Sequence, residues 1–270
     1  MIELAMPTFD ENGFLDGRIQ FWVESQRVSH RKLIERAQEL NRDCHRFLDG
    51  RALSPGNGKQ IATSLLFARL LELYQSIILV SERGMAATIR ILLRASLEAS
   101  YHFLAIQRDP TYLNDYLNQF LIQKSKLVKR IRQSTSSEIE MQSLRQGASE
   151  RVLEEVEQAI RKEKARAISI EEVAKRAGCH NSYLTAYAVL SHAVHTGASD
   201  IDHHIQVNDV TKETEGFKYG PSESETVRAI CLSGTTLAEA LELVSQNFGE
   251  DRTALCVAHK EAFQSFLEKA

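Results

Sequence analysis

Two stretches of this sequence carry polar side chains at four-residue intervals within apolar runs. The first lies between residues 83 and 105 and contains Arg90, Arg94, Glu98 and His102. Residues four apart share one face of an α-helix, so these side chains form a polar stripe on a helix that is otherwise apolar and buried. Two interpretations remain open, a functional site and an internal Arg94–Glu98 ion pair that fixes helix packing. If the pair is buried, removing Glu98 should cost about 3–5 kcal/mol.

The second stretch contains Tyr183, Tyr187, Ser191 and His195, again four residues apart. Its other residues are mostly apolar, so we expect a buried helix whose stripe faces the first one and forms a polar pocket with it. Arginines can hold a phosphate or carboxylate there, and a histidine can act as a general acid or base near neutral pH. The candidate catalytic residues are Arg94, Glu98, Tyr187, Ser191 and His195.

A histidine-rich segment follows the second stripe. His192 and His195 lie about one helical turn apart, and His203 and His204 come shortly afterwards. Histidines at this spacing can chelate a metal ion. However, the segment has no H-E-x-x-H pattern, no paired E-x-x-H pattern and no cysteine at ligand distance. We therefore expect no metal or other cofactor, and the alternatives are acid–base chemistry by His195 and histidines that only form hydrogen bonds.

Two further segments have features of nucleic-acid binding. Residues 169–180 resemble the first helix and turn of a helix-turn-helix DNA-binding head, but the apolar stretch that follows lacks the polar, exposed face of a recognition helix. A basic run over residues 124–132 can hold RNA phosphates. The acidic residues downstream of it favour the simpler interpretation, a solvated helix face with balanced charge. DNA is therefore the least favoured partner.

The composition is that of an ordinary globular protein. The chain has 270 residues, of which 43% are hydrophobic and 26% charged, and its net charge of -3 gives no reason to expect nucleic-acid or membrane binding. No uncharged stretch approaches the ~20 apolar residues of a membrane span, and the N-terminus lacks the basic region of a signal peptide. The four cysteines are far apart, which predicts reduced thiols. We expect a cytoplasmic protein without membrane contact.

Runs with helical periodicity account for most of the chain, and the few prolines and glycines gather between them. This pattern predicts an all-α fold, a single domain over residues 1–270 that forms a bundle of seven or eight major helices. Residues 1–17 should be an irregular arm, and residues 197–222 a loop or lid. The expected helices span residues 18–48, 59–80, 83–105, 110–133, 138–167, 183–196, 224–246 and 252–269, with a short one over 169–177.

At the two polar stripes the chain resembles a bacterial family of uncharacterised helical proteins. Its members carry an R-x-x-x-E helix after a hydrophobic helix pair, here Arg94 to Glu98. They later carry a Y-x-x-x-S-x-x-x-H helix, here Tyr187, Ser191 and His195. The similarity spans roughly residues 60–200 and implies an intracellular all-α protein. By helix arrangement alone, the chain is also similar to HEPN-type proteins, many of which are RNA-cleaving toxins that use Arg and His without metal.

Three functional hypotheses follow. In the first, the pocket between the stripes binds a phosphate-bearing ligand such as RNA or a nucleotide, or cleaves it as an enzyme. In the second, the protein is a helical interaction module, for example a homodimer, in which the stripes only fix packing. The third, a DNA-binding regulator, has the weakest support. The sequence leaves open whether the protein is an enzyme.

Overall fold

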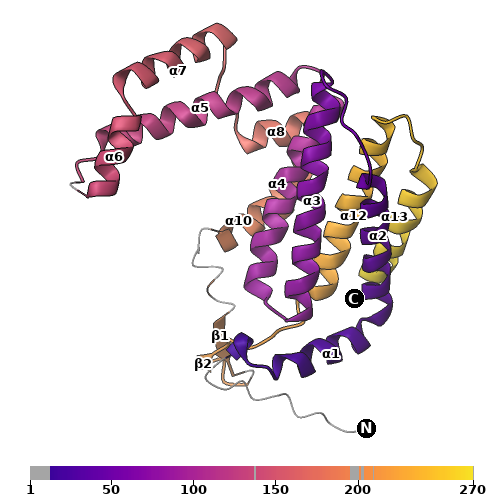
Figure 1. The fold of residues 1–270 in the computed structure, drawn as a ribbon. Helices are drawn as coiled ribbons and strands as arrows, with labels where there is room; N and C mark the ends of the chain where they lie inside the picture. Colours follow the sequence, from indigo (N-terminus) through magenta and orange to yellow (C-terminus); the bar gives the residue numbers. More distant parts are fainter. Residues whose placement is uncertain (1–12, 137, 195–200, 202–203, 209, 270) are drawn as a thin grey trace.

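The computed structural model describes residues 13–136, 138–194, 201, 204–208 and 210–269. These residues form a bundle of α-helices with one small β-hairpin at its edge (Figure 1). The predicted all-α class is confirmed, although the described chain has more helices than the seven or eight predicted.

The elements of the described chain follow one another in a simple order, with the hairpin between α10 and α12. The helices are η1 (Gly13–Leu15), α1 (Ile19–Ser29), α2 (Arg31–Leu48), α3 (Gly58–Glu82), α4 (Ala86–Arg108), α5 (Tyr112–Gln133), α6 (Ile139–Gly147), α7 (Glu150–Glu163), α8 (Ile170–Arg176), α9 (His180–Ser182), the π-helical turn η2 (Tyr183–Tyr187), α10 (Ala188–Val194), α12 (Thr226–Gln246) and α13 (Thr253–Leu267), and the strands are β1 (Ile205–Val207) and β2 (Thr214–Phe217).

The centre of the bundle is formed by α3, α4 and α12, which pack against one another, with α2 and α13 alongside α12 (Figure 1). Their facing side chains build one hydrophobic core that includes Phe47, Phe67, Phe103 and Phe263. By length and composition α3 is also apolar enough to cross a membrane, and half of that apolar stretch is buried inside the bundle. Packing in the core is therefore a sufficient reason for its apolar composition.

The helix predicted over residues 18–48 is divided at His30 into α1 and α2. Figure 1 shows that α1 crosses the end of the bundle, whereas α2 runs along it. Only one side of α1, which includes Trp22 and Val23, is therefore buried. Phe21 and Val28, two apolar residues of the predicted helix, are exposed because they lie on the other side of α1.

The helix predicted over residues 138–167 is also divided, at Ala148, into α6 and α7. The break coincides with a new helix start, because the Ser149 side chain accepts a hydrogen bond from the backbone N–H of Val152. Helix α7 pairs antiparallel with α5, the helix that precedes α6. Together α5, α6 and α7 form a helical arm that projects from the bundle (Figure 1).

The segment predicted as a loop or lid over residues 197–222 contains a hairpin. Strands β1 and β2 pair antiparallel, with Ile205 opposite Phe217. Periodicity did not reveal these strands, because they are only three and four residues long. After the hairpin the chain is fastened to the start of α4, where the Ser222 N–H donates to the Gly84 carbonyl at 2.9 Å.

Candidate functional site

The four polar residues of the α4 stripe lie in three different environments. Arg94 and Glu98 meet the second stripe, as expected. Arg90 instead lines a cavity beside the hairpin. His102 faces Tyr112, whose hydroxyl lies 2.7 Å from its Nδ1 atom. The expectation that the whole stripe faces the second one is therefore wrong, because only Arg94 and Glu98, its two candidate site residues, meet the second helix.

Arg94, Glu98, Tyr187 and Ser191 form a connected group, called here the Arg94 cluster. The Arg94 guanidinium donates from Nη2 to the Tyr187 hydroxyl at 2.7 Å and from Nε to the Ser191 hydroxyl at 3.2 Å. The Tyr187 hydroxyl in turn donates to Glu98 Oε2 at 3.1 Å. Arg94 Nη1 lies 3.5 Å from the same carboxylate oxygen. The predicted contact between the two stripes is thus present in these four residues.

The second helix reaches Arg94 through an irregular turn. Sequence periodicity predicts one helix over residues 183–196, whereas Tyr183–Tyr187 is a π-helical turn between α9 and α10. Such turns are rare and occur frequently at functional sites. The Tyr183 ring stacks on the Tyr187 ring at 5.2 Å, and the His180 ring stacks on Tyr183 at 6.3 Å. This row of rings fixes the direction of the Tyr187 hydroxyl.

One residue beside the cluster was missed from the sequence. Tyr101 lies 5.9 Å from the Tyr187 ring, and its hydroxyl is 2.9 Å from the Ser182 hydroxyl. In an apolar helix a tyrosine resembles any other core residue. Only the hydroxyl-bearing Ser182 across from it could have indicated the contact.

The cluster is partly open to solvent. The side chain of Arg94 is 19% exposed and that of Glu98 is 40% exposed, whereas Tyr187 is buried. The Arg94–Glu98 pair is therefore not the fully internal ion pair of the second interpretation. The pair lies at the solvent-exposed edge of the contact between α4 and α10, where water solvates the Glu98 carboxylate.

This exposure lowers the expected effect of removing Glu98. We now expect Glu98→Ala to cost about 1 kcal/mol, which is the net value of one hydrogen bond plus little from a solvated ion pair. Urea unfolding of the variant measures the cost. A loss of about 3–5 kcal/mol, typical of a broken buried pair, would contradict the open geometry.

The Tyr187 hydroxyl is a neutral donor over the physiological range. Burial, reinforced by the negative charge of Glu98, raises the pKa of Tyr187 to about 12. The phenol therefore keeps its proton and holds the Glu98 carboxylate in place. Because Tyr187 is not ionised, its oxygen does not neutralise the positive charge of Arg94.

This raised pKa predicts a pH-dependent stability difference between the wild type and Tyr187→Phe. Unfolded tyrosine ionises near pH 10 and folded Tyr187 near pH 12, so the folded protein binds the proton more tightly in that interval. The wild type should exceed the variant by about 1 kcal/mol below pH 10, from the lost hydrogen bonds, and this advantage should shrink as the pH rises towards 12. Urea unfolding at pH 8, 9.5 and 10.5 tests this, and an advantage that is constant with pH would contradict it.

His195, the proposed proton-transfer residue, lies outside the residues that the structure describes, as does His203. Of the other two histidines in that segment, His192 is exposed on α10, and His204 precedes β1. Within the described ranges no group of three or more His, Cys, Asp or Glu side chains is arranged to hold a metal ion. The role of His195 thus stays a prediction.

His102 belongs to a structural network at the base of the arm. Its ring packs against Tyr112 and Tyr116, and burial lowers the pKa of His102. Tyr112 is fully buried, and the Arg176 guanidinium lies over its ring at 5.4 Å. Arg176 also pairs with Asp115 at 2.7 Å. These contacts join α4, α5 and α8 and explain His102 without a catalytic role.

The segments considered for nucleic-acid binding are used in packing or in charge pairs. On α8, Val173 and Ala174 are buried, and Ser169 caps the helix, because its hydroxyl accepts a hydrogen bond from the Glu172 N–H at 3.2 Å. In the basic run, Lys129 pairs with Glu157 at 2.9 Å and Arg132 pairs with Glu150. The interpretation of that run as a face with balanced charge is thereby supported.

The four cysteines are free thiols, as predicted. Cys44, Cys231 and Cys256 are buried and Cys179 is partly buried. Burial raises the pKa of each thiol. They therefore remain protonated and belong to the packing of the bundle rather than to a reactive site.

Residues 60–213 match a family described as a family of unknown function, DUF5677. The match covers more than half of the chain, so this protein belongs to that family. No curated protein and no solved structure matches the chain. The matched region includes both helices that form the Arg94 cluster.

Proposed function

We propose that this protein binds single-stranded RNA at the Arg94 cluster and cleaves it without a metal ion. The observation that carries the proposal is the cluster itself. Two helices almost a hundred residues apart converge to fix one guanidinium in a polar setting that is open to solvent on one side. Such an arrangement is suited to an anionic ligand.

The guanidinium keeps donors available for a ligand. Arginine has five N–H donors, and among the described residues its contacts with Glu98, Tyr187 and Ser191 use at most three of them. The contacts with Tyr187 and Ser191 fix the plane of the Arg94 guanidinium group. The remaining donors suit a bidentate contact with two phosphate oxygens, and the Arg94 side chain is partly exposed, so a ligand can reach them from solvent.

In the proposed reaction His195, which follows Ser191 by four residues in the sequence, takes the proton of a ribose 2′-hydroxyl. The 2′-oxygen then forms a bond with the adjacent phosphorus, and the bond from phosphorus to the 5′-oxygen breaks. The leaving oxygen takes a proton from water, and the hydroxide that remains takes the proton from His195, which restores the neutral histidine. Arg94 stabilises the additional negative charge on the phosphate oxygens during this step. The products are an RNA with a 2′,3′-cyclic phosphate and an RNA with a 5′-hydroxyl.

The test incubates the wild-type protein with a labelled single-stranded RNA in EDTA. We expect cleavage to persist, with 2′,3′-cyclic phosphate ends, because no step uses a metal ion. A matched DNA oligonucleotide should stay intact, since it lacks the 2′-hydroxyl. Absence of both RNA binding and cleavage, or cleavage that stops in EDTA, would reject the proposal.

A second candidate function, a helical interaction module, is favoured by the surface of the helical arm. Leu117, Phe120 and Leu127 lie along one side of α5 and are exposed, with Phe120 at 64%. A row of apolar side chains facing solvent is typical of a surface that a second protein covers. A second copy of this chain is the simplest partner.

This candidate predicts that the protein dimerises through α5. Phe120→Glu should convert the dimer to a monomer, because a carboxylate in an apolar interface would be desolvated without a partner. Light scattering measures the mass, and Leu144→Glu, a similar change at an exposed residue of α6, is the control. A wild-type protein that is monomeric at high concentration would exclude the homodimer.

A further inference from the structure

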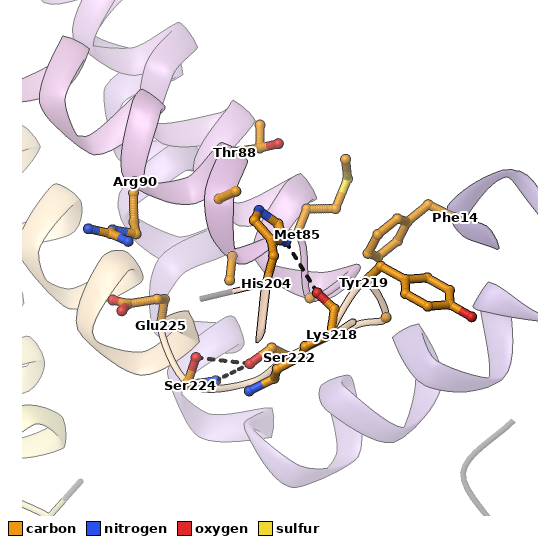
Figure 2. Close-up of a pocket in the computed structure, with 14 residues that line it drawn as sticks. Phe14, Met85, Thr88, Arg90, His204, Lys218, Tyr219, Ser222, Ser224 and Glu225 are labelled. Atoms are coloured by element: carbon orange, nitrogen blue, oxygen red, sulfur yellow. Dashed lines mark hydrogen bonds between the residues drawn. The ribbon is translucent and has the colours of Figure 1, made fainter. Parts of the chain in front are cut away.

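A cavity of about 130 Å³ lies between the first turn of α4 and the chain that enters and leaves the hairpin. Arg90 lines it, one helical turn before Arg94, so the cavity and the Arg94 cluster are neighbours on the same helix. Figure 2 shows Arg90 and Glu225 at one end of this cavity and the Phe14 and Tyr219 rings together at the other.

The start of α4 gives the cavity a positive floor. Met85 at the N-cap makes no side-chain hydrogen bond to the helix. Among the described residues, no group accepts a hydrogen bond from the N–H of Ala87 or of Thr88. Because the side chains of Ala86 and Ala87 are small, these backbone donors lie close to the cavity. The helix dipole adds partial positive charge at the same place.

Basic side chains from three segments surround this floor. Arg90 comes from α4 and is 8% exposed, while His204 and Lys218 come from the two sides of the hairpin. The hairpin ends are held together, since the Lys218 N–H donates to the His204 carbonyl at 2.8 Å and His204 Nδ1 lies 3.2 Å from the Lys218 carbonyl. Among the described residues of the lining, Glu225 is the acidic one. The described lining therefore has more basic than acidic side chains, which suits an anion.

The wall opposite the helix is held in a fixed position. Gly84 has a φ of +68°, and a Cβ there would lie 2.7 Å from the backbone N of Ser222. That close approach allows the Ser222 N–H to bond the Gly84 carbonyl. The Ser222 hydroxyl, which lines the cavity, is thereby placed beside the first turn of α4.

The volume of the cavity and the residues at its open end indicate which class of ligand it can hold. Its volume is below the roughly 300–1,000 Å³ of pockets that enclose a whole drug-sized ligand, but it accommodates a phosphate group. The rest of the ligand must then extend outwards. Phe14 and Tyr219, which is 71% exposed, present aromatic rings at one end, and such rings stack with nucleobases.

We propose that this cavity binds the terminal phosphate monoester of a nucleotide, either at the 5′ end of an RNA chain or on a free mononucleotide. The phosphate contacts the first turn of α4, Arg90 and Lys218, and the base stacks on Tyr219. For its RNA form the inference rests on the proposed function, since the anchored end would place the following nucleotides beside Arg94.

The experiment compares the affinities of two RNA oligonucleotides of one sequence, with a 5′-phosphate and with a 5′-hydroxyl, together with a mononucleotide and inorganic phosphate. His195→Ala serves as the background so that the RNA stays intact. Two variants change the cavity. Lys218→Asn removes a cation, and Ala87→Asp places a carboxylate on the floor while favouring the helix start. Lys212→Asn, at a hairpin residue outside the lining with a φ of 61° that asparagine tolerates, is the matched control.

We expect the 5′-phosphorylated RNA to bind at least about tenfold more tightly than the 5′-hydroxyl RNA, the value of one charge-assisted contact. Ala87→Asp should abolish this preference, Lys218→Asn should reduce it, and Lys212→Asn should preserve it. Competition by the mononucleotide, but not by equal inorganic phosphate, would support the stacking on Tyr219 and identify free nucleotides as a second source. Equal affinity for both RNAs together with no binding of the mononucleotide would overturn the inference, as would a preference that Ala87→Asp leaves intact.

The two proposals fail in different ways. If the 5′-phosphate preference is present but wild-type protein leaves RNA uncut, the cavity inference stands and the proposed cleavage fails. If RNA is cut equally well with either 5′ end, both RNAs bind alike and the mononucleotide does not bind, cleavage stands and the cavity inference fails.

Discussion

Replacing Arg94 by lysine should lower the rate of RNA cleavage by at least about 100-fold, comparable to the loss of one donor that stabilises transition-state charge. Lysine retains the positive charge but not the planar fork. It cannot contact Tyr187 and Ser191 while also presenting two donors to a phosphate. The measurement is the single-turnover cleavage rate at saturating RNA, with the melting temperature recorded on the same preparations.

His195→Ala should reduce the same rate by roughly 10²–10⁴-fold, the range for loss of a general base. Arg94→Lys should lose little stability, because the Arg94 side chain is partly exposed. Arg69→Lys, at an exposed position of α3, is the control and should cleave like the wild type. If Arg94→Lys and His195→Ala both stay folded and cleave like the wild type, the Arg94 cluster is not a catalytic site. If the two variants lose stability and the wild type shows no cleavage that can be measured apart from folding, the result would favour the helical interaction module.

The sequence identified the contact between the two polar stripes but extended the site too far along α4. The physical reason is the helical repeat. Four residues advance about 400° around an α-helix, so each step of the stripe rotates by about 40° and three steps by about 120°. Arg94 and Glu98 differ by one step and reach the same neighbour. Arg90 is also one step from Arg94, but it lies about 6 Å nearer the start of α4, where its neighbour is the hairpin cavity, and His102, one step beyond Glu98, faces Tyr112.

The overall class was predictable because long apolar runs with helical spacing leave few alternatives. The exposures were less predictable. Periodicity indicates which side of a helix is apolar but not whether another element covers it, as Phe21 on α1 and Phe120 on α5 show. The cavity beside α4 was not predictable at all. Its lining combines the backbone of a helix start with Lys218 and Tyr219, more than a hundred residues away, and no local pattern links them.

Gly234→Ala should destabilise the protein by about 2–3 kcal/mol, within the usual cost of overpacking a core. Alanine is normally the better helix former, by about 1 kcal/mol, so the expected sign is opposite to that of helix propensity. Gly234 lies in α12 where α13 packs closely against it. A Cβ at this position would be 2.5 Å from Cε2 of Phe263, a fully buried ring, so the ring or the helix must move.

The comparison variant is Gly147→Ala in α6, where an added Cβ meets nothing within 4 Å. It should leave stability unchanged or raise it by up to about 0.5 kcal/mol, through helix propensity alone. Urea unfolding of both variants measures the difference. For a chain of this size, a loss of about 2–3 kcal/mol corresponds to a melting temperature lower by roughly 5–10 °C.

A double-variant cycle shows whether the ring of Phe263 causes the loss. Phe263→Leu removes the atoms nearest to the new methyl group and should itself destabilise the core by leaving a cavity. In the Gly234→Ala background, however, it also relieves the overlap. The double variant should therefore be more stable than the sum of the two single effects predicts, by about 1 kcal/mol. Strictly additive effects would mean that α12 and α13 are separated by more than this structure shows, and the close crossing at the centre of the bundle would need to be revised.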